Sequence, residues 1–128
     1  MTNIEEKKID GVDSTNKITF ADLGLSEKML TKITAKGYQY PSAIQAWVIP
    51  LLLNGEKDII GQAQTGTGKT AAFGLPVLER LDANSKDIQA LILAPTRELA
   101  IQVAEELRSF ADSSVQIQLF YGGQNIRD

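Results

Sequence analysis

The residues with the clearest chemical potential form a glycine- and threonine-rich segment, residues 63–70, with the sequence AQTGTGKT. It departs from the phosphate-loop pattern G-x-x-x-x-G-K-[ST] only at its first position, where alanine replaces glycine. Gly66 and Gly68 let the backbone turn its N–H groups toward a polyphosphate. Lys69 can reach the β- and γ-phosphates of a nucleoside triphosphate, and the Thr70 hydroxyl can bind Mg²⁺. We therefore predict a nucleoside triphosphate site with Lys69 and Thr70 as its catalytic residues.

The chain around this segment supplies the elements that such a site needs. Residues 58–62 predict a short buried strand, and residues 68–81 predict a helix. The positive N-terminal end of that helix would face the phosphates. A surface turn that merely contains a lysine is the alternative, but both the spacing and the strand–loop–helix context favour the phosphate site.

Two helices are expected before this unit and one after it. Residues 26–36 predict a helix that Gly37 caps at its C-terminal end. A second helix should begin at Ser42 and be kinked or restarted at Pro50. Residues 97–110 predict a helix whose Leu99, Val103, Leu107 and Phe110 face inward.

Two more strands complete the expected pattern. Residues 89–94 (QALILA) form a near-continuous apolar run, which is typical of a strand covered on both faces. Residues 115–120 (VQIQLF) alternate between apolar and polar residues, which predicts a third strand. Alternating strands and helices indicate an α/β fold with a parallel sheet and flanking helices. Three strands make a small sheet, so we expect an incomplete domain.

Composition narrows the possible chemistry. The 128 residues include no cysteine and no histidine, which excludes disulfides, thiolate metal sites and imidazole catalysis. The net charge of −3 means that any nucleic-acid contact must be local rather than a property of the whole surface. Residues 1–17 are polar and lack periodicity, so we expect a mobile leader. A reducing cytoplasm is compatible with this composition, and we expect a cytoplasmic protein without a membrane-spanning segment.

A second motif assigns the chain to a family. The segment 37–45, GYQYPSAIQ, resembles the Q motif of DEAD-box RNA helicases, and Phe20 occupies the place of that motif's upstream aromatic residue. With AQTGTGKT, this resemblance implies that Gln45 pairs with the adenine edge and that Tyr38 packs against the base. A glutamine amide offers one donor and one acceptor, which match adenine N7 and the adenine N6 amino group respectively. Without the family, Gln45 closes a capping box with Ser42, and the two aromatic residues belong to the core. A glutamine can serve both roles.

The implied cofactors are ATP and Mg²⁺, with Thr70 as the metal ligand. The predicted nucleotide-binding residues are Phe20, Tyr38, Gln45, Ala63, Gln64, Thr65, Gly66, Thr67, Gly68, Lys69 and Thr70.

Two further segments resemble the family's RNA-contacting elements. Residues 95–100, PTRELA, resemble motif Ia, and the pair at 122–123 resembles its GG element. The family implies RNA-backbone contact at both, and a helix N-terminus with a threonine and an arginine suits phosphate binding. An ordinary capped helix start and an ordinary Gly-Gly turn are the alternatives. The predicted RNA-binding residues are Pro95, Thr96, Arg97, Gly122 and Gly123.

The resemblance extends from about residue 20 to residue 128. It implies that residues 18–128 are part of the first RecA-like, phosphate-loop NTPase domain of a helicase core. The family's D-E-A-D and S-A-T motifs and its second RecA-like domain are absent from this sequence. The implied parent protein couples ATP hydrolysis to local unwinding of RNA, with contacts mainly to the backbone, whereas we expect this segment alone to hydrolyse ATP negligibly. A DNA helicase or a nucleotide-binding module without turnover are the competing hypotheses.

Overall fold

The computed structural model describes residues 17–55 and 58–124. The predicted leader lies outside these residues except for Lys17, as do residues 125–128 of the predicted domain. The described elements are η1 Phe20–Leu23, α1 Glu27–Ala35, α2 Ala43–Leu53, α3 Lys69–Arg80 and α4 Arg97–Phe110. The four α-helices follow the expected order, whereas the short 3-10 helix η1 was not predicted.

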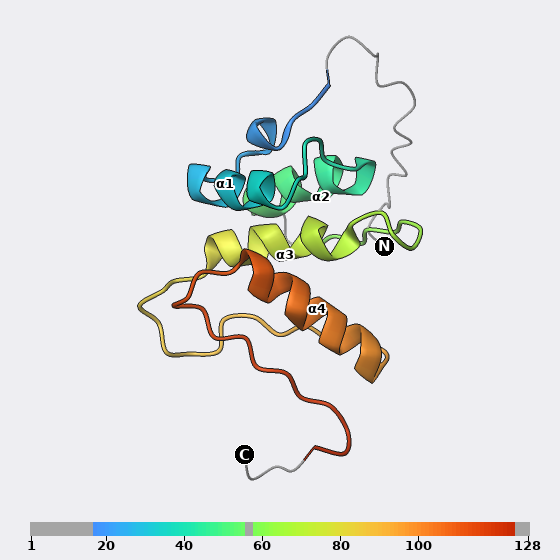
Figure 1. Cartoon of the computed structure of the whole chain (residues 1–128), viewed down its shortest axis with the longest axis vertical. Helices are drawn as coiled ribbons and strands as arrows, with labels where there is room; N and C mark the ends of the chain where they lie inside the picture. Colours follow the sequence, from blue (N-terminus) through green and yellow to red (C-terminus); the bar gives the residue numbers. More distant parts are fainter. Residues whose placement is uncertain (1–16, 56–57, 125–128) are drawn as a thin grey trace.

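The helices form a stack with α3 in its middle. In Figure 1, α1 and α2 lie on one side of α3 and α4 lies on the other. The main helix contacts are between α2 and α3 and between α3 and α4. Among the described residues, no helix is long and apolar enough to cross a bilayer. The phosphate-loop segment leads directly into the central helix of the stack, so its position is fixed by packing on both sides.

Side-chain caps fix where α1, α2 and α4 begin. Ser26 accepts a hydrogen bond from Met29 N–H at the start of α1, and Thr96 accepts one from Leu99 N–H at the start of α4. Gly37 follows α1 with a positive φ of 84°. The helix α2 continues through Pro50 as one element, so the predicted restart does not occur.

The core joins residues from every helix. Its main cluster surrounds four side chains that are almost completely inaccessible to solvent: Ile33, Ile49, Leu75 and Phe110. The prediction that α4 points four residues inward is confirmed for Val103, Leu107 and Phe110, but Leu99 is 39% exposed. Leu99 lies in the first turn of α4, at the open end of the helix stack.

The predicted parallel sheet is not shown. Within 17–55 and 58–124 no strand is present, and no backbone hydrogen bond joins two of the segments 58–62, 89–94 and 115–120. The expectation that 89–94 is covered on both faces is wrong for this chain, because Leu91 is 80% exposed and Leu93 is 85% exposed. An apolar pattern predicts burial, but a strand also requires backbone hydrogen bonds to a neighbouring segment, and none joins these three segments in the described part of the chain.

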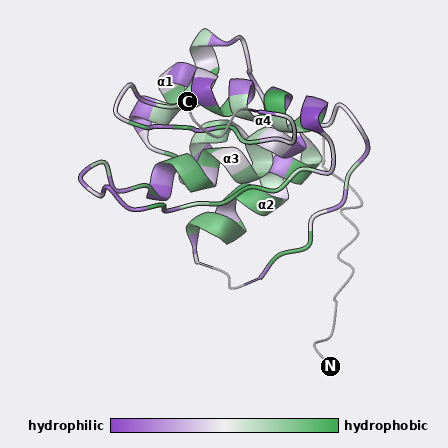
Figure 2. Cartoon of the chain, turned by 90° about the horizontal axis from the view of Figure 1, so that it is seen from below, coloured by the Kyte–Doolittle hydropathy of each residue, from purple (hydrophilic) through white to green (hydrophobic). Residues whose placement is uncertain are grey.

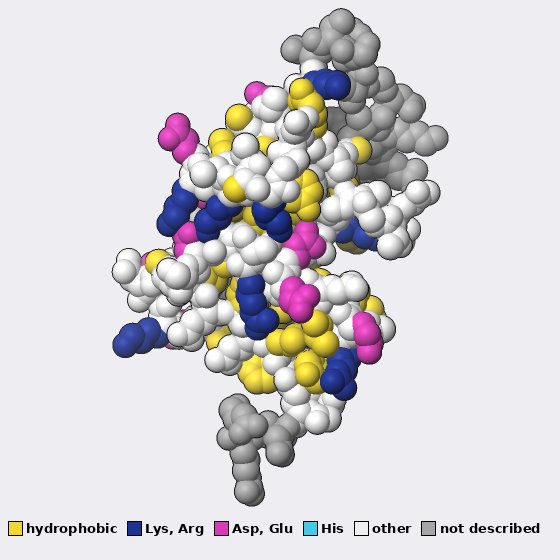
Figure 3. Space-filling model, in the orientation of Figure 1, with side chains coloured by type: hydrophobic (Ala, Val, Ile, Leu, Met, Phe, Trp, Pro, Cys, Tyr) yellow, Lys and Arg dark blue, Asp and Glu magenta, His cyan; other side chains and the backbone are white. Residues whose placement is uncertain are grey.

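These extended segments leave apolar surface on one side of the helix stack. Figure 2 shows hydrophobic residues along extended stretches beside the helices, and Figure 3 shows hydrophobic side chains gathered on the lower half of the molecule. The most exposed large apolar residues are Ile60, Ile88, Leu91, Leu93 and Phe120. Residues 115–120 nevertheless keep the predicted alternation, since Val115, Ile117 and Leu119 are half-buried and the residues between them are exposed.

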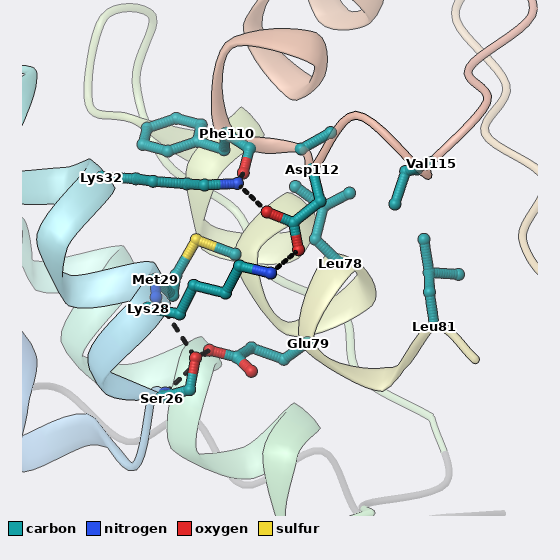
Figure 4. A pocket seen from close by; sticks show the side chains of 11 residues that line it. Ser26, Lys28, Met29, Lys32, Leu78, Glu79, Leu81, Phe110, Asp112 and Val115 are labelled. Atoms are coloured by element: carbon teal, nitrogen blue, oxygen red, sulfur yellow. Dashed lines mark hydrogen bonds and ion pairs between the residues drawn. The ribbon is translucent and has the colours of Figure 1, made fainter. Parts of the chain in front are cut away.

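A small charged junction ties α1 to the C-terminal end of α4. It borders a cavity of about 160 Å³ between α1 and the ends of α3 and α4 (Figure 4). The Asp112 carboxylate binds Lys28 at 2.7 Å and also binds Lys32, whose ammonium donates to the Phe110 carbonyl at 2.8 Å. Opposite them, Glu79 accepts hydrogen bonds from the N–H and hydroxyl of Ser26. The charged groups around the cavity therefore bind partners within the chain, Asp112 by ion pairs and Glu79 by hydrogen bonds to a neutral residue.

The junction predicts an acid-dependent stability. Hydrogen bonds from Lys28 and Lys32 lower the pKa of Asp112 from its ordinary value of 3.8. A lowered folded-state pKa contributes stability that is complete above 3.8 and lost as the pH falls through the folded-state value. We expect Asp112→Asn to flatten the fall in unfolding free energy below about pH 4, measured by denaturant titration. Asp87→Asn, an exposed aspartate in a turn, is the matched control, and an Asp112→Asn profile as steep as the control's would contradict the prediction.

Candidate functional site

The phosphate-loop segment adopts a conformation that only glycine tolerates easily at two positions. Gly66 and Gly68 both have a φ of 81°, in the left-handed region. Nothing lies within 4 Å of the space that a Cβ on Gly66 would occupy, whereas a Cβ on Gly68 would overlap the Gln45 amide. Gly66 is therefore required for the turn alone, and Gly68 for both the turn and a close contact with α2.

Lys69 folds back across the mouth of the loop. Its ammonium donates a hydrogen bond of 2.6 Å to the carbonyl oxygen of Ala63, the first residue of the motif. Within the loop, the Thr67 hydroxyl donates to the Gln64 carbonyl at 2.7 Å. The lysine is exposed, so its positive charge lies at the surface of the loop, where an incoming anion can reach it.

The start of α3 offers free donors beside this lysine. Gly68 is the N-cap residue and contributes no side chain, and no other side chain caps the helix among the described residues. The first N–H groups of a helix have no partner within the helix, and they carry its positive dipole. Thr70, in the first turn, is half-buried. The loop amides, Lys69 and the Thr70 hydroxyl thus present the donors that suit a polyphosphate and the oxygen that suits its Mg²⁺.

Gln45 connects the two predicted nucleotide motifs. It is 4% exposed and is the only buried polar residue of the described chain. Its Oε1 accepts a hydrogen bond from the Ser42 N–H at 2.9 Å, which confirms the capping box. Its Nε2 donates to the Gly68 carbonyl at 3.2 Å, at the start of α3. The glutamine therefore caps α2 and also holds the phosphate loop.

The two aromatic residues that the family resemblance singles out lie in different surroundings. Phe20 is 5% exposed and belongs to the main core cluster, which also contains Ala71 of α3. Tyr38 is 43% exposed, and its ring centroid lies 6.3 Å from that of Phe110. Phe20 thus supports the helix that begins at the loop, while Tyr38 is accessible. Within the described residues, no hydrogen bond or ring contact joins Phe20 or Tyr38 to the loop.

The predicted RNA-binding residues meet through a residue that sequence reasoning missed. The Arg97 guanidinium lies 4.3 Å from the centroid of the Tyr121 ring, and Tyr121 directly precedes the glycines at 122–123. Arg97 begins α4, which Thr96 caps as the alternative interpretation predicted. The signal available for Tyr121 is an aromatic residue between the alternating segment 115–120 and the Gly-Gly pair. Pro95 and both glycines are exposed.

A comparison with known protein families identifies the family to which this chain belongs. The family model described as DEAD/DEAH box helicase matches residues 42–128, from the capping serine of α2 through the phosphate loop and the Gly-Gly turn. The chain belongs to the DEAD/DEAH box helicase family. The phosphate loop and the α2 cap that contacts it therefore lie within, or at the boundary of, one matched segment of this helicase family.

Curated relatives of this DEAD-box chain are much longer than it is. The chain is 55% identical over 109 residues to the ATP-dependent RNA helicase CshA of Limosilactobacillus reuteri, covering 84% of this chain and 22% of that protein. It is 53% identical over 108 residues to the ATP-dependent RNA helicase CshA of Listeria monocytogenes, covering 84% and 21%. The chain thus spans about a fifth of the length of these relatives.

Solved structures of DEAD-box proteins share the arrangement of the chain. A DEAD box protein from the hyperthermophile Methanococcus jannaschii matches with a TM-score of 0.75 and 46% identity, over 84% of this chain and 30% of that one. Saccharomyces cerevisiae Dbp5, bound to RNA and ADP BeF3, matches with a TM-score of 0.71 and 39% identity, over 84% and 29%.

The contact between Gln45 and Gly68 in this DEAD-box chain can be tested by coupled substitutions. We expect Gly68→Ala to lower the free energy of unfolding more than Gly66→Ala does. Both substitutions incur about 1–2 kcal/mol of strain from the left-handed backbone, but only a Cβ at residue 68 overlaps the Gln45 amide. In a Gln45→Ala background the overlap is removed, so the cost of Gly68→Ala should fall by at least about 0.5 kcal/mol. The cost of Gly66→Ala, the matched control, should stay the same. Denaturant unfolding measures all four differences, and strictly additive costs for Gly68→Ala and Gln45→Ala would show that the contact does not couple the two motifs.

Proposed function

We propose that this chain is the ATP-binding part of a DEAD-box RNA helicase. In this proposal it binds ATP with Mg²⁺ and part of an RNA backbone, and the whole protein couples ATP hydrolysis to local unwinding of RNA duplexes. The observation that carries the proposal is the hydrogen bond between the buried Gln45 amide and the phosphate loop at Gly68. It joins the residue expected to recognise adenine to the loop expected to hold the phosphates. The relatives named ATP-dependent RNA helicase support the same activity.

The phosphate loop would bind the triphosphate with little rearrangement of its backbone. The glycine turns at Gly66 and Gly68 are already formed, and the start of α3 lacks a side-chain cap. Lys69 would exchange its bond to the Ala63 carbonyl for the β- and γ-phosphate oxygens. The Thr70 hydroxyl would hold Mg²⁺, which neutralises charge on the phosphates when it is bound.

The base would be recognised on the α2 side of the loop. A glutamine side chain can make four hydrogen bonds, and Gln45 uses one donor and one acceptor within the chain. One donor and one acceptor remain for the N7 and N6 groups of adenine. The exposed ring of Tyr38 is available to pack against the base, whereas Phe20 would act through the core rather than by contact.

The RNA surface would lie at the N-terminal end of α4. The Thr96 cap, the Arg97 guanidinium and the exposed glycines at 122–123 surround this end of the helix. Arginine suits phosphate oxygens because its donors form a planar fork, and a bare glycine backbone allows a close approach. Such contacts hold the backbone and carry little sequence information.

The segments that stay extended in this chain would be strands in the whole protein. We propose that 58–62, 89–94 and 115–120 form the parallel sheet of a RecA-like domain, with the helices on its faces. The likeness to DEAD-box structures supports this arrangement, as does the exposed apolar surface along the segments.

Nucleotide binding should depend on Lys69. Replacing Lys69 with alanine removes a charge-assisted bond to phosphate, so we expect the affinity for a fluorescent ATP analogue with Mg²⁺ to fall about tenfold to a hundredfold. Lys86→Ala, which removes an exposed lysine from the turn after α3, is the matched control and should bind normally. Equal affinities of the two variants would remove the phosphate loop from the proposal.

Turnover should depend on RNA and on the rest of the protein. We expect RNA to stimulate ATP hydrolysis by the full-length protein more than DNA of the same sequence does, and the 128-residue chain alone to hydrolyse ATP negligibly. Steady-state phosphate release measures both. Equal stimulation by RNA and DNA would favour a general nucleic-acid motor. ATP binding without turnover in the full-length protein would favour a nucleotide-binding module. Robust turnover by the 128-residue chain would contradict the expectation that hydrolysis needs the rest of the protein.

A further inference from the structure

Tyr121 lies where two separate parts of the chain come together. Figure 1 shows the segment after α4 turning back below that helix, and the Tyr121 ring meets Arg97 at the first position of α4. A distance of 4.3 Å between the guanidinium carbon and the ring centroid is well inside the range of a cation–π contact. The Arg97 guanidinium thus lies over the face of the ring.

A tight turn fixes the backbone on which the tyrosine stands. The Gln124 N–H donates to the Tyr121 carbonyl at 3.4 Å, and the Gln124 side-chain oxygen accepts from the Tyr121 N–H at 3.2 Å. Gly123 has a φ of 90°, which the turn requires of a glycine. Both backbone polar groups of Tyr121 are therefore engaged, and the ring projects from a defined position.

Among the described residues, nothing gives Gly122 such an explanation. It has no positive φ, and nothing lies within 4 Å of the space that its Cβ would occupy. A side chain at this position would thus be tolerated by the described residues. The bare backbone leaves open surface beside the Arg97–Tyr121 pair, and open surface next to an aligned arginine suits a ligand from outside the chain.

We propose that Tyr121 is a positioning residue for RNA binding. Its ring holds the Arg97 guanidinium so that the donors of Arg97 and the exposed backbone at Gly122 face the same stretch of RNA backbone. This inference rests on the proposed RNA surface at the start of α4 and adds the residue that aligns it. An unsupported arginine samples many rotamers, and stacking on the ring removes that freedom before RNA arrives. Tyr121 itself needs no contact with RNA in this arrangement.

The test is a double-mutant cycle on RNA affinity in the full-length protein. The probe is a fluorescein-labelled oligouridylate, measured by anisotropy with ADP–beryllium fluoride present. Tyr121→Leu should weaken binding about threefold to tenfold, and Tyr121→Phe, which keeps the ring, should stay within about twofold. Arg97→Ala should weaken binding about tenfold and lower the salt slope by about 0.7, the loss of one phosphate contact to a single strand. In the Arg97→Ala background, Tyr121→Leu should have no further effect.

Three controls separate positioning from loss of structure. The affinity for a fluorescent ATP analogue should be the same in Tyr121→Leu and the unsubstituted protein. Lys86→Ala should leave both the RNA affinity and the salt slope unchanged. Arg97→Lys, which keeps the charge but loses the planar group, should bind RNA weakly and be less sensitive to Tyr121→Leu.

The outcomes distinguish this inference from the proposed function. An undiminished effect of Tyr121→Leu in the Arg97→Ala background would show that the ring acts independently of the arginine and would overturn the positioning role. Normal binding by Tyr121→Leu, together with weak binding by Arg97→Ala, would also overturn it while leaving the RNA surface in place. Normal binding by Arg97→Ala would instead remove Arg97 from the proposed RNA surface, and the inference with it.

Discussion

The arrangement of this chain depends on one buried side chain amide. Gln45 accepts from the Ser42 N–H and donates to the Gly68 carbonyl, so one residue ends the loop before α2 and fixes the start of α3. A buried amide without hydrogen-bond partners would destabilise the fold, but the Gln45 oxygen and nitrogen each have a partner. The packing of α2 on α3 brings the two backbones close enough for the bond, and Gly68 leaves the space that it needs. Helix capping, helix packing and loop shape are thereby set together.

Local signals in the sequence predict most of the helical structure. The caps at Ser26, Ser42 and Thr96 and the glycine after α1 mark helix ends correctly, because capping depends on a few neighbouring residues. The inward face of α4 follows from the 3.6-residue period at Val103, Leu107 and Phe110 but not at Leu99, in the outermost turn of the helix. The sheet was a different kind of prediction. Apolar runs indicate which residues seek burial, but strand pairing is a long-range property that depends on backbones elsewhere.

The candidate site could be predicted in part for the same reason. The phosphate loop is contiguous in sequence, so its glycines, lysine and threonine were recognised from spacing. The capping role of Gln45 was also local, and the structure confirms it. Its bond to Gly68 spans 23 positions and required the helix packing. The Arg97–Tyr121 pair was missed because no local pattern relates the start of one helix to a residue 24 positions later.

The two arginines of α4 have a consequence for the length of the segment that follows the helix. Arg97 meets Tyr121 at one end of α4, and near the other end Arg108 donates to the Ile117 carbonyl at 2.8 Å. The returning segment is thus attached to the helix at two points, four residues apart on the segment. Deleting one residue between these points would shorten an extended chain by about 3.3 Å and turn the following side chains to the opposite face. Such a chain could keep one attachment but not both, so this stretch tolerates changes of residue type more readily than insertions or deletions.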